Sequence, residues 1–124
     1  MKGGWPLDNP EDIFTVALFA LKCSDIGHGA KKFKLHEEWS HRVNEEFFCQ
    51  GDKEKLLGIP ITPDRDRNLV EIEESQYDFL IFSPIPLFEL FCSRFPQCND
   101  LLSQMKENLK TWKNRIEEKK INTK

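Results

Sequence analysis

The stretch Ile13–Leu21 is the most hydrophobic part of the chain, and it limits what the chain can fold into. Its pattern predicts a helix over 10–22 that is apolar on almost every side, and such a helix must be buried on several sides. The stretch is about half as long as a membrane-spanning helix, which needs ~20 apolar residues. Acidic residues precede it, whereas a signal peptide begins with positive charge. We therefore expect neither membrane insertion nor secretion.

The size of the chain adds a second constraint. A sequence of 124 residues has little material with which to surround such a helix. If the helix forms, a large apolar patch is expected on the isolated chain, and such patches mark interfaces or aggregation sites. The pattern therefore indicates that part of the protein lies outside this sequence. It also predicts that residues 1–124 alone are poorly soluble, molten or self-associated.

The charge balance narrows the class of partner. The chain carries 18 basic and 21 acidic residues, a net charge of −3 at pH 7. General nucleic-acid binders show a basic patch or stripe, so nucleic acid is not an expected partner. The four cysteines at positions 23, 49, 92 and 98 lack CxxC or zinc-finger spacing. Without a secretion signal, this favours reduced thiols and a cytoplasmic location.

Helical periodicity continues after the first helix. Further helices are predicted over 35–50, 68–83, 87–93 and 101–118, with a helical turn at 53–57. The helix over 35–50 has an apolar residue at every fourth position, namely Leu35, Trp39, Val43 and Phe47. Gly51 is expected just past its C-terminus, where a left-handed residue often ends a helix.

Capping and proline signals set the other expected boundaries. Asn68 is a suitable N-cap for the helix over 68–83, with Glu71 three residues later as in a capping box. Pro84 and Pro86 are expected to break or kink the chain after it. No segment shows a convincing two-residue period, and no internal repeat is present. The sequence therefore predicts an all-α fold, a helical bundle joined by proline-rich turns.

One polar residue interrupts an apolar helix face. Ile72, Gln76, Phe79 and Ser83 are spaced to share one face of a helix. A buried amide without a partner costs about 1–3 kcal/mol, so Gln76 needs hydrogen bonds. It could be a core glutamine bonded to a backbone group. Alternatively, it could read the edge of a purine, with the Phe79 ring stacking on the base.

Asp25 is the second candidate, because it directly follows the apolar helix. A carboxylate at the C-terminal end of a helix opposes the helix dipole and needs solvent, a hydrogen bond or a cation. Asp25 could be solvated, could cap the next turn, or could be a metal ligand. The three histidines at 28, 36 and 41 show no metal-binding or triad spacing, and no glycine-rich phosphate loop is present.

Several segments of the chain resemble the motifs of a known family, and they occur in the same order as in that family. The segment 20–26 (ALKCSDI) resembles the "ALKCAD" segment of class I 3′,5′-cyclic-nucleotide phosphodiesterases, and 39–52 (WSHRVNEEFFCQGD) resembles their W(S/T)xxVxEEFFxQGD stretch. The segments 61–67, 75–79 and 86–88 are similar to the family's ISPxxDR, xQxxF and PLF motifs. The order and spacings agree from about Glu11 to Phe91, and the last helix also suits the family's C-terminal end.

The resemblance implies an all-helical, HD-type, metal-dependent hydrolase that uses Zn²⁺ and usually Mg²⁺ (or Mn²⁺). By this resemblance Asp25 is the final zinc-ligating aspartate, Gln76 hydrogen-bonds the purine, and Phe79 clamps the base. The resemblance also implies a set of positions in the wall of the substrate pocket. These positions are His28, His36, Trp39, Ser40, Val43 and Ser75.

The chain also departs from the family pattern. The family's other zinc ligands, two His and an Asp, and its general-acid His lie upstream of the segment that begins here, so no catalytic residue is expected within 1–124. A single carboxylate cannot form a catalytic zinc site. Residues 27–29 read Gly-His-Gly where the family has Ser-Asn-Pro, and Asp64 replaces a Met or Leu near the pocket. Pro84 is an additional proline after Phe79.

Together these features predict the C-terminal part of a phosphodiesterase catalytic domain over 11–118, with an irregular lead-in at 1–10 and a flexible tail at 119–124. The expected function is hydrolysis of cyclic AMP or cyclic GMP to the 5′-monophosphate. The expected partners are the cyclic nucleotide and a missing N-terminal half of the domain. The alternative is a non-catalytic remnant that binds nucleotides or acts as a helical interaction module. In either case 1–124 alone is expected to be inactive.

Overall fold

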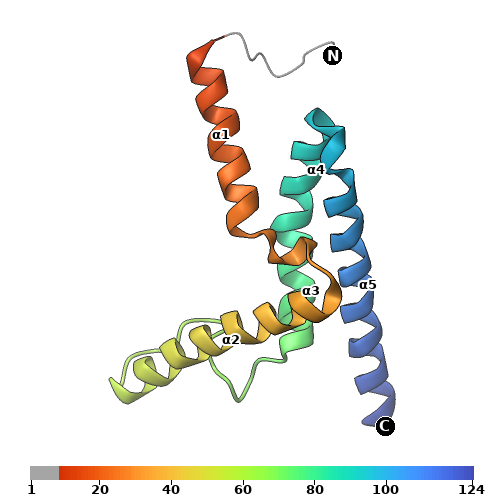
Figure 1. The fold of residues 1–124 in the computed structure, drawn as a ribbon. Coiled ribbons are helices and arrows are strands. Elements are labelled where there is room, and N and C mark those ends of the chain that lie inside the picture. Colours follow the sequence, from red (N-terminus) through yellow and green to blue (C-terminus); the bar gives the residue numbers. More distant parts are fainter. Residues whose placement is uncertain (1–8) are drawn as a thin grey trace.

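The computed structural model describes residues 9–124, and these residues form helices without any strand (Figure 1). The predicted all-α fold is therefore confirmed. The lead-in predicted at 1–10 lies almost wholly outside the described residues. The helices are α1 (Pro10–Asp25), α2 (Phe33–Leu56), α3 (Ile72–Phe82), α4 (Pro84–Arg94) and α5 (Asn99–Asn122), with short 3-10 turns η1 (Gly27–Ala30) and η2 (Pro96–Cys98).

The core lies where α3 and α4 pack along α5 (Figure 1). Leu80 of α3 and Met105 of α5 are completely buried there, and Trp112 lies two turns further along α5. Cys23 of α1 and Phe88 of α4 join the same cluster. α2 leaves this core at a steep angle and carries most of its length away from it (Figure 1).

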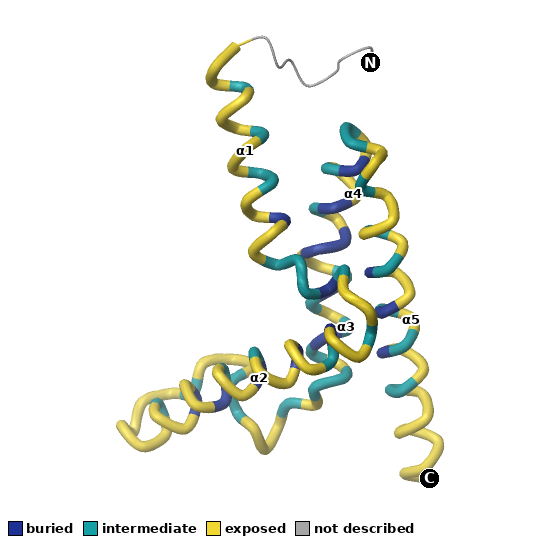
Figure 2. The backbone as a smooth tube through the Cα atoms, viewed as in Figure 1, coloured by how far each residue is buried: buried dark blue, intermediate teal, exposed yellow. Residues whose placement is uncertain are grey.

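Helix α1 begins as the sequence predicts but is not enclosed. The Asn9 side chain caps it by accepting a hydrogen bond from the Asp12 backbone N–H at 2.9 Å, and Pro10 occupies its first turn. It touches α4, where the Phe19 and Phe91 rings stack at 5.7 Å. Most of its apolar surface nevertheless faces outward, and Cys23 is its one buried residue (Figure 2). The sequence predicts that α1 is buried on several sides, but residues 9–124 leave most of it exposed.

Helix α2 is longer than predicted, because Gly51 does not end it. The helix continues through the predicted turn at 53–57 to Leu56. Gly51 is instead required by a close approach, since a Cβ atom there would lie 2.0 Å from the Arg65 carbonyl oxygen. The left-handed glycine after the helix is Gly58, with φ +67°.

The inward face of α2 is mostly polar. Its buried residues are His36, Ser40, Asn44, Phe48 and Gly51. The apolar stripe that identifies this helix in the sequence lies one position away, and the Trp39 side chain on it is 44% exposed. Periodicity therefore locates the helix correctly but does not identify the face that the neighbouring helices cover.

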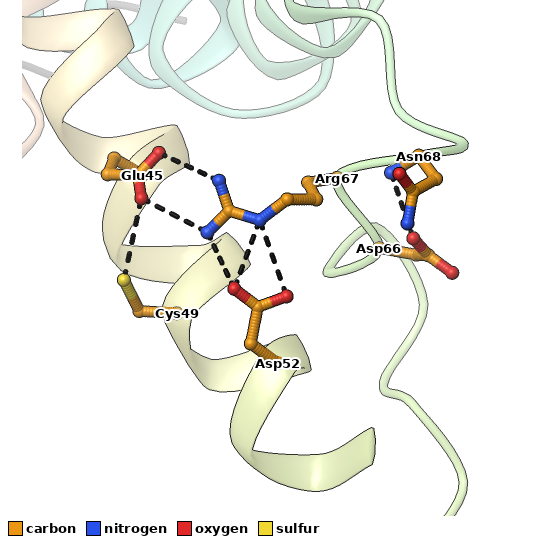
Figure 3. A network of polar contacts seen from close by, with 6 residues as sticks. All are labelled: Glu45, Cys49, Asp52, Asp66, Arg67 and Asn68. Carbon is orange, nitrogen blue, oxygen red and sulfur yellow. Dashed lines mark hydrogen bonds and ion pairs between the residues drawn. The ribbon is translucent and has the colours of Figure 1, made fainter. Parts of the chain in front are cut away.

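Arg67 holds the connection between α2 and α3 against α2 (Figure 3). Its guanidinium donates to Asp52 Oδ2 at 2.7 Å and to Glu45 Oε1 at 3.1 Å. These bonds lower the pKa of both carboxyl groups. The Asp66 side chain accepts from the Asn68 backbone N–H at 2.9 Å, which closes a local turn.

The N-cap predicted at Asn68 is therefore wrong. The turn at 66–68 takes the chain out of helical geometry, and α3 begins only at Ile72. The break predicted at proline is present, because α3 ends at Phe82 and Pro84 is the first residue of α4. α4 thus starts three residues before the predicted helix over 87–93. α5 continues past the boundary predicted at 118 and reaches Asn122, with Lys119 paired to Glu71 and Glu73.

Candidate functional site

The predicted site residues come from four consecutive elements that meet near the base of α2. Gln76, Phe79 and Ser75 lie on α3, while His28 lies in η1 and Asp25 ends α1. The remaining members lie on α2, and they are His36, Trp39, Ser40 and Val43. Contacts of α2 with both η1 and α3 bring this set together.

Gln76 is buried, and its amide is held by α2. Its side chain is 4% exposed, and its Oε1 accepts a hydrogen bond from the Ser40 hydroxyl at 2.9 Å. The same hydroxyl lies 2.8 Å from the His36 carbonyl oxygen. The bond turns the amide oxygen toward α2 and the Nε2 end away from Ser40. The partner is a side chain, not the backbone group expected for a core glutamine.

Asn44 extends this polar layer, and sequence reasoning did not identify it. Its Nδ2 donates to the Ser40 carbonyl oxygen at 2.8 Å, and its Oδ1 accepts from the Ser75 hydroxyl at 3.5 Å. Asn44 lies one turn after Ser40, so the buried polar spacing 36, 40 and 44 was the available signal. The layer links α2 and α3 around Gln76.

Two histidines meet at the junction of η1 and α2. His28 Nδ1 lies 3.1 Å from His36 Nδ1, and the Trp112 indole donates to His36 Nε2 at 2.8 Å. Burial and the neighbouring His28 lower the pKa of His36 to about 4. Burial also lowers the pKa of His28. Both imidazoles are therefore neutral at pH 7.

Phe79 stacks beside these histidines. The His28 and Phe79 rings are almost parallel, with an interplanar angle of 3° and ring centres 5.7 Å apart. His28 and His36 are also stacked, with ring centres 5.1 Å apart. The arrangement makes one aromatic surface from three elements, and a flat heterocycle can stack on such a surface.

Helix α5 supports this surface, and the sequence analysis missed that role. Asn108 is buried, and its Nδ2 lies 2.8 Å from the carbonyl oxygens of both Gly29 and Lys31. These bonds fix the backbone on the C-terminal side of His28. Asn108 and Trp112 are four residues apart and share one face of α5. In the sequence, Trp112 belongs to the apolar stripe of this helix, and Asn108 is a polar residue next to that stripe.

A groove of about 690 Å³ opens next to this region. Asp25, His28, Trp39 and Val43 are among its lining residues, whereas Gln76, Phe79 and Ser40 are not. Asp25 is exposed at the end of α1. The structure thus joins His28 to Phe79 and Ser40 to Gln76, while Asp25 lies in the groove with His28 and Trp39.

The residues present do not make a metal site. Residues 9–124 contain no group of three or more His, Cys, Asp or Glu side chains arranged to hold a metal ion. A catalytic zinc takes three protein ligands, and Asp25 is a single exposed carboxylate. Among the same residues, no helix is long and apolar enough to cross a bilayer.

Comparisons with known proteins identify one family. The family described as 3'5'-cyclic nucleotide phosphodiesterase matches residues 5–105. A Caenorhabditis elegans protein described as "Probable 3',5'-cyclic-AMP phosphodiesterase pde-4" is 35% identical over 113 residues, covering 90% of this chain and 17% of the relative. A Rattus norvegicus "3',5'-cyclic-AMP phosphodiesterase 4C" is 32% identical over 111 residues, covering 89% of this chain and 21% of the relative.

A solved structure matches as well. The "Structure of LmjPDEB1 in complex with IBMX" is similar with a TM-score of 0.87 and 26% sequence identity, over 92% of this chain and 35% of that chain. The chain therefore spans about a fifth of the length of the curated relatives it matches, and about a third of that solved chain.

Proposed function

Since the chain belongs to the 3'5'-cyclic nucleotide phosphodiesterase family, we propose that it is the nucleotide-recognition part of a domain that hydrolyses a cyclic nucleotide to its 5′-monophosphate. The observation that carries this proposal is the arrangement of Gln76 and Phe79. The amide is buried and oriented by Ser40, and the aromatic ring lies one turn further along α3 beside His28.

Each site residue then has a proposed role. The Gln76 amide offers one donor and one acceptor, which match the edge of a purine. Phe79 stacks on the face of the base. The walls of the nucleotide site are His28, His36, Trp39, Ser40, Val43 and Ser75. Cyclic AMP is the favoured substrate over cyclic GMP, because the similar proteins are described as cyclic-AMP phosphodiesterases.

We further propose that Asp25 is one ligand of a metal centre that holds Zn²⁺ and Mg²⁺ (or Mn²⁺). Its place among the lining residues of the groove, together with His28, supports this role. The remaining ligands would come from the N-terminal part of the domain, outside residues 9–124. That part is also the proposed partner of α1, whose apolar face is open (Figure 2). A cytoplasmic location stays a prediction.

The test uses the complete catalytic domain that contains this chain, assayed with cyclic AMP and cyclic GMP. Gln76→Ala is expected to raise KM for the preferred nucleotide at least about tenfold, which corresponds to about 1.4 kcal/mol of binding free energy. Gln50→Ala is the matched control, because Gln50 is an exposed glutamine on α2 that bonds Glu54. An unchanged KM in Gln76→Ala contradicts the proposed recognition role.

The alternative, a non-catalytic nucleotide-binding module, is separated by a second measurement. Residues 1–124 alone are expected to show no hydrolysis of cyclic AMP with Zn²⁺ and Mg²⁺ present, since they hold one proposed ligand. The complete domain is expected to hydrolyse it, and Asp25→Asn is expected to abolish that turnover. If the complete domain binds cyclic AMP without hydrolysing it, the module replaces the enzyme as the explanation.

A further inference from the structure

Three side chains from three elements form one hydrogen-bonded chain that ends at the groove. Trp112 on α5 and His36 on α2 are 1% and 0% exposed, and their ring nitrogens are 2.8 Å apart. His36 in turn contacts His28 of η1 through the two Nδ1 atoms, 3.1 Å apart. His28 is part of the groove lining.

The position of each proton follows from the chemistry of these groups. An indole nitrogen only donates, so His36 Nε2 must accept from Trp112 and carries no proton. A neutral imidazole has one N–H, and that of His36 is therefore at Nδ1. Two facing Nδ1 atoms share one proton, so His28 Nδ1 is the acceptor. The single proton of neutral His28 is then at Nε2, on the part of the ring that points away from His36.

The backbone that carries His28 is held from the same helix. Asn108 lies one turn before Trp112 and bonds the carbonyl oxygens of Gly29 and Lys31 at 2.8 Å. Arg115, one turn after Trp112, lies over the Trp112 ring at 5.3 Å and pairs with Glu37 of α2. α5 therefore holds the backbone next to His28 and also supplies the indole donor at the start of the hydrogen-bonded chain.

We propose that Trp112 is a positioning residue that fixes the tautomer of His28 through His36, so that His28 presents its Nε2–H to an acceptor atom of the bound nucleotide. The inference rests on the proposed function for the identity of the ligand. An imidazole free to exchange tautomers is as much an acceptor as a donor. Purine bases offer ring-nitrogen acceptors, and His28 lies parallel to the Phe79 ring on which the base would stack.

The first experiment reads the tautomers directly by ¹⁵N NMR of the labelled histidine rings in the complete catalytic domain that contains this chain. The expected result at pH 7 is an unprotonated Nδ1 and a protonated Nε2 for His28, with the opposite assignment for His36. In Trp112→Phe, His28 is expected to become a mixture of both tautomers. Replacing Trp112 by benzothienylalanine removes the N–H donor and keeps the shape, so it serves if Trp112→Phe does not fold.

A matched control separates this role from packing. Phe33 contacts the Trp112 ring edge-on at 5.0 Å and takes no part in the hydrogen-bonded chain. Phe33→Leu is expected to lower the melting temperature as Trp112→Phe does, while leaving both tautomers unchanged. A wild-type His28 protonated at Nδ1, or tautomers that stay the same without the Trp112 donor, would overturn the proposal.

The second experiment measures the consequence for the nucleotide in the complete catalytic domain, with cyclic AMP as the probe. The benzothienylalanine variant is expected to raise KM about fivefold or more with kcat changed less than about twofold, because a donor that binds ground and transition states equally affects KM. Phe33→Leu is expected to leave KM unchanged. If wild-type protein shows no saturable response to cyclic AMP, the proposed function fails. If the wild-type rate saturates with cyclic AMP but the benzothienylalanine variant has the same KM, only this inference fails.

Discussion

Buried polar side chains near Gln76 are satisfied by one another, and this makes their chemistry interdependent. Ser40 bonds Gln76, and Asn44 bonds both the Ser40 backbone and Ser75. His36 lies next to this layer and is bonded to Trp112 and His28. In a low-dielectric interior, removal of one member leaves another group without its partner, and that loss exceeds the net value of the bond.

Ser40→Ala tests this dependence at Gln76. Removing the hydroxyl leaves the buried Oε1 without its donor, and we expect a loss of about 1–3 kcal/mol in the free energy of unfolding. Ser93→Ala is the matched control, because the Ser93 hydroxyl bonds the Leu90 carbonyl at an exposed position. Urea unfolding measures both variants. Equal stabilities of the two would mean that Ser40 does not hold the amide.

The pKa of His36 predicts a specific loss of stability in acid. Burial and His28 lower the folded-state pKa to about 4, below the ordinary value of 6.5. Between these values the unfolded chain binds more protons than the folded chain, so stability falls as pH falls. Well above pH 6.5 both states are neutral, and the contribution is constant. The total loss from pH 6.5 to 4 amounts to about 3 kcal/mol at most.

Unfolding free energies measured across this pH range check the prediction. His36→Gln keeps an acceptor for the Trp112 indole and removes the titrating group. Its stability is expected to depend less on pH between 4 and 6.5 than that of the wild type, whatever its stability at pH 7. A wild-type profile that is flat in this window would show that His36 titrates normally in the folded state.

The connection between α2 and α3 shows how an element is positioned by close backbone approach as well as by charge. Arg67 forms ion pairs with Glu45 and Asp52 of α2 (Figure 3). The Arg65 guanidinium lies over the Phe47 ring at 3.6 Å. Gly51 lets the Arg65 carbonyl lie directly on the helix. α3 starts shortly after this anchor, so its location relative to α2 depends on it.

Gly51→Ala is expected to displace the connection. Its Cβ would lie 2.0 Å from the Arg65 carbonyl oxygen, and backbone cannot move away as a flexible side chain can. We expect a loss of about 2–4 kcal/mol in unfolding free energy, although alanine is intrinsically the better helix former by about 1 kcal/mol. Gly27→Ala is the control, because a Cβ there has no atom within 4 Å. A Gly51→Ala protein as stable as the control would contradict the close approach.

On the scale of the whole molecule, the main feature is the exposed apolar face of α1. Phe14 and Leu21 are 65% and 66% exposed, and Ile13 and Leu18 are also half exposed. An apolar face of this extent on a helix marks a protein interface or an aggregation site. None of residues 9–124 covers this face, and the proposed partner is the N-terminal part of the domain. The chain spans about a fifth of the length of the curated relatives it matches.

The isolated chain is therefore expected to self-associate through α1. Phe14 and Leu18 lie one turn apart, and changing both to Lys is expected to shift the chain toward monomer in size-exclusion chromatography with light scattering. Changing Leu69 and Ile121 to Lys is the control, because these side chains are 81% and 72% exposed but lie on other elements. A monomeric wild type with a sharp cooperative melt would count against the expectation.

Local signals were sufficient for much of the fold. Apolar periodicity located every long helix, and Pro84 marked the break between α3 and α4. The boundaries failed where a distant residue intervened. Gly51 looked like a helix end and is a contact point for Arg65, and Asn68 looked like an N-cap and belongs to the turn closed by Asp66. Both errors come from tertiary contacts that override a local preference.

By itself, the sequence determined the helical class, the approximate helices and, through motifs that keep their order, the family. It also singled out Gln76, Phe79 and Asp25, whose roles stay proposals. Only the tertiary structure decided which face of α2 is buried and which groups lie against the two histidine rings. His36 and Trp112 are 76 positions apart, and no local pattern links them. Periodicity describes one helix at a time, whereas a tautomer depends on the group that another helix places against the ring.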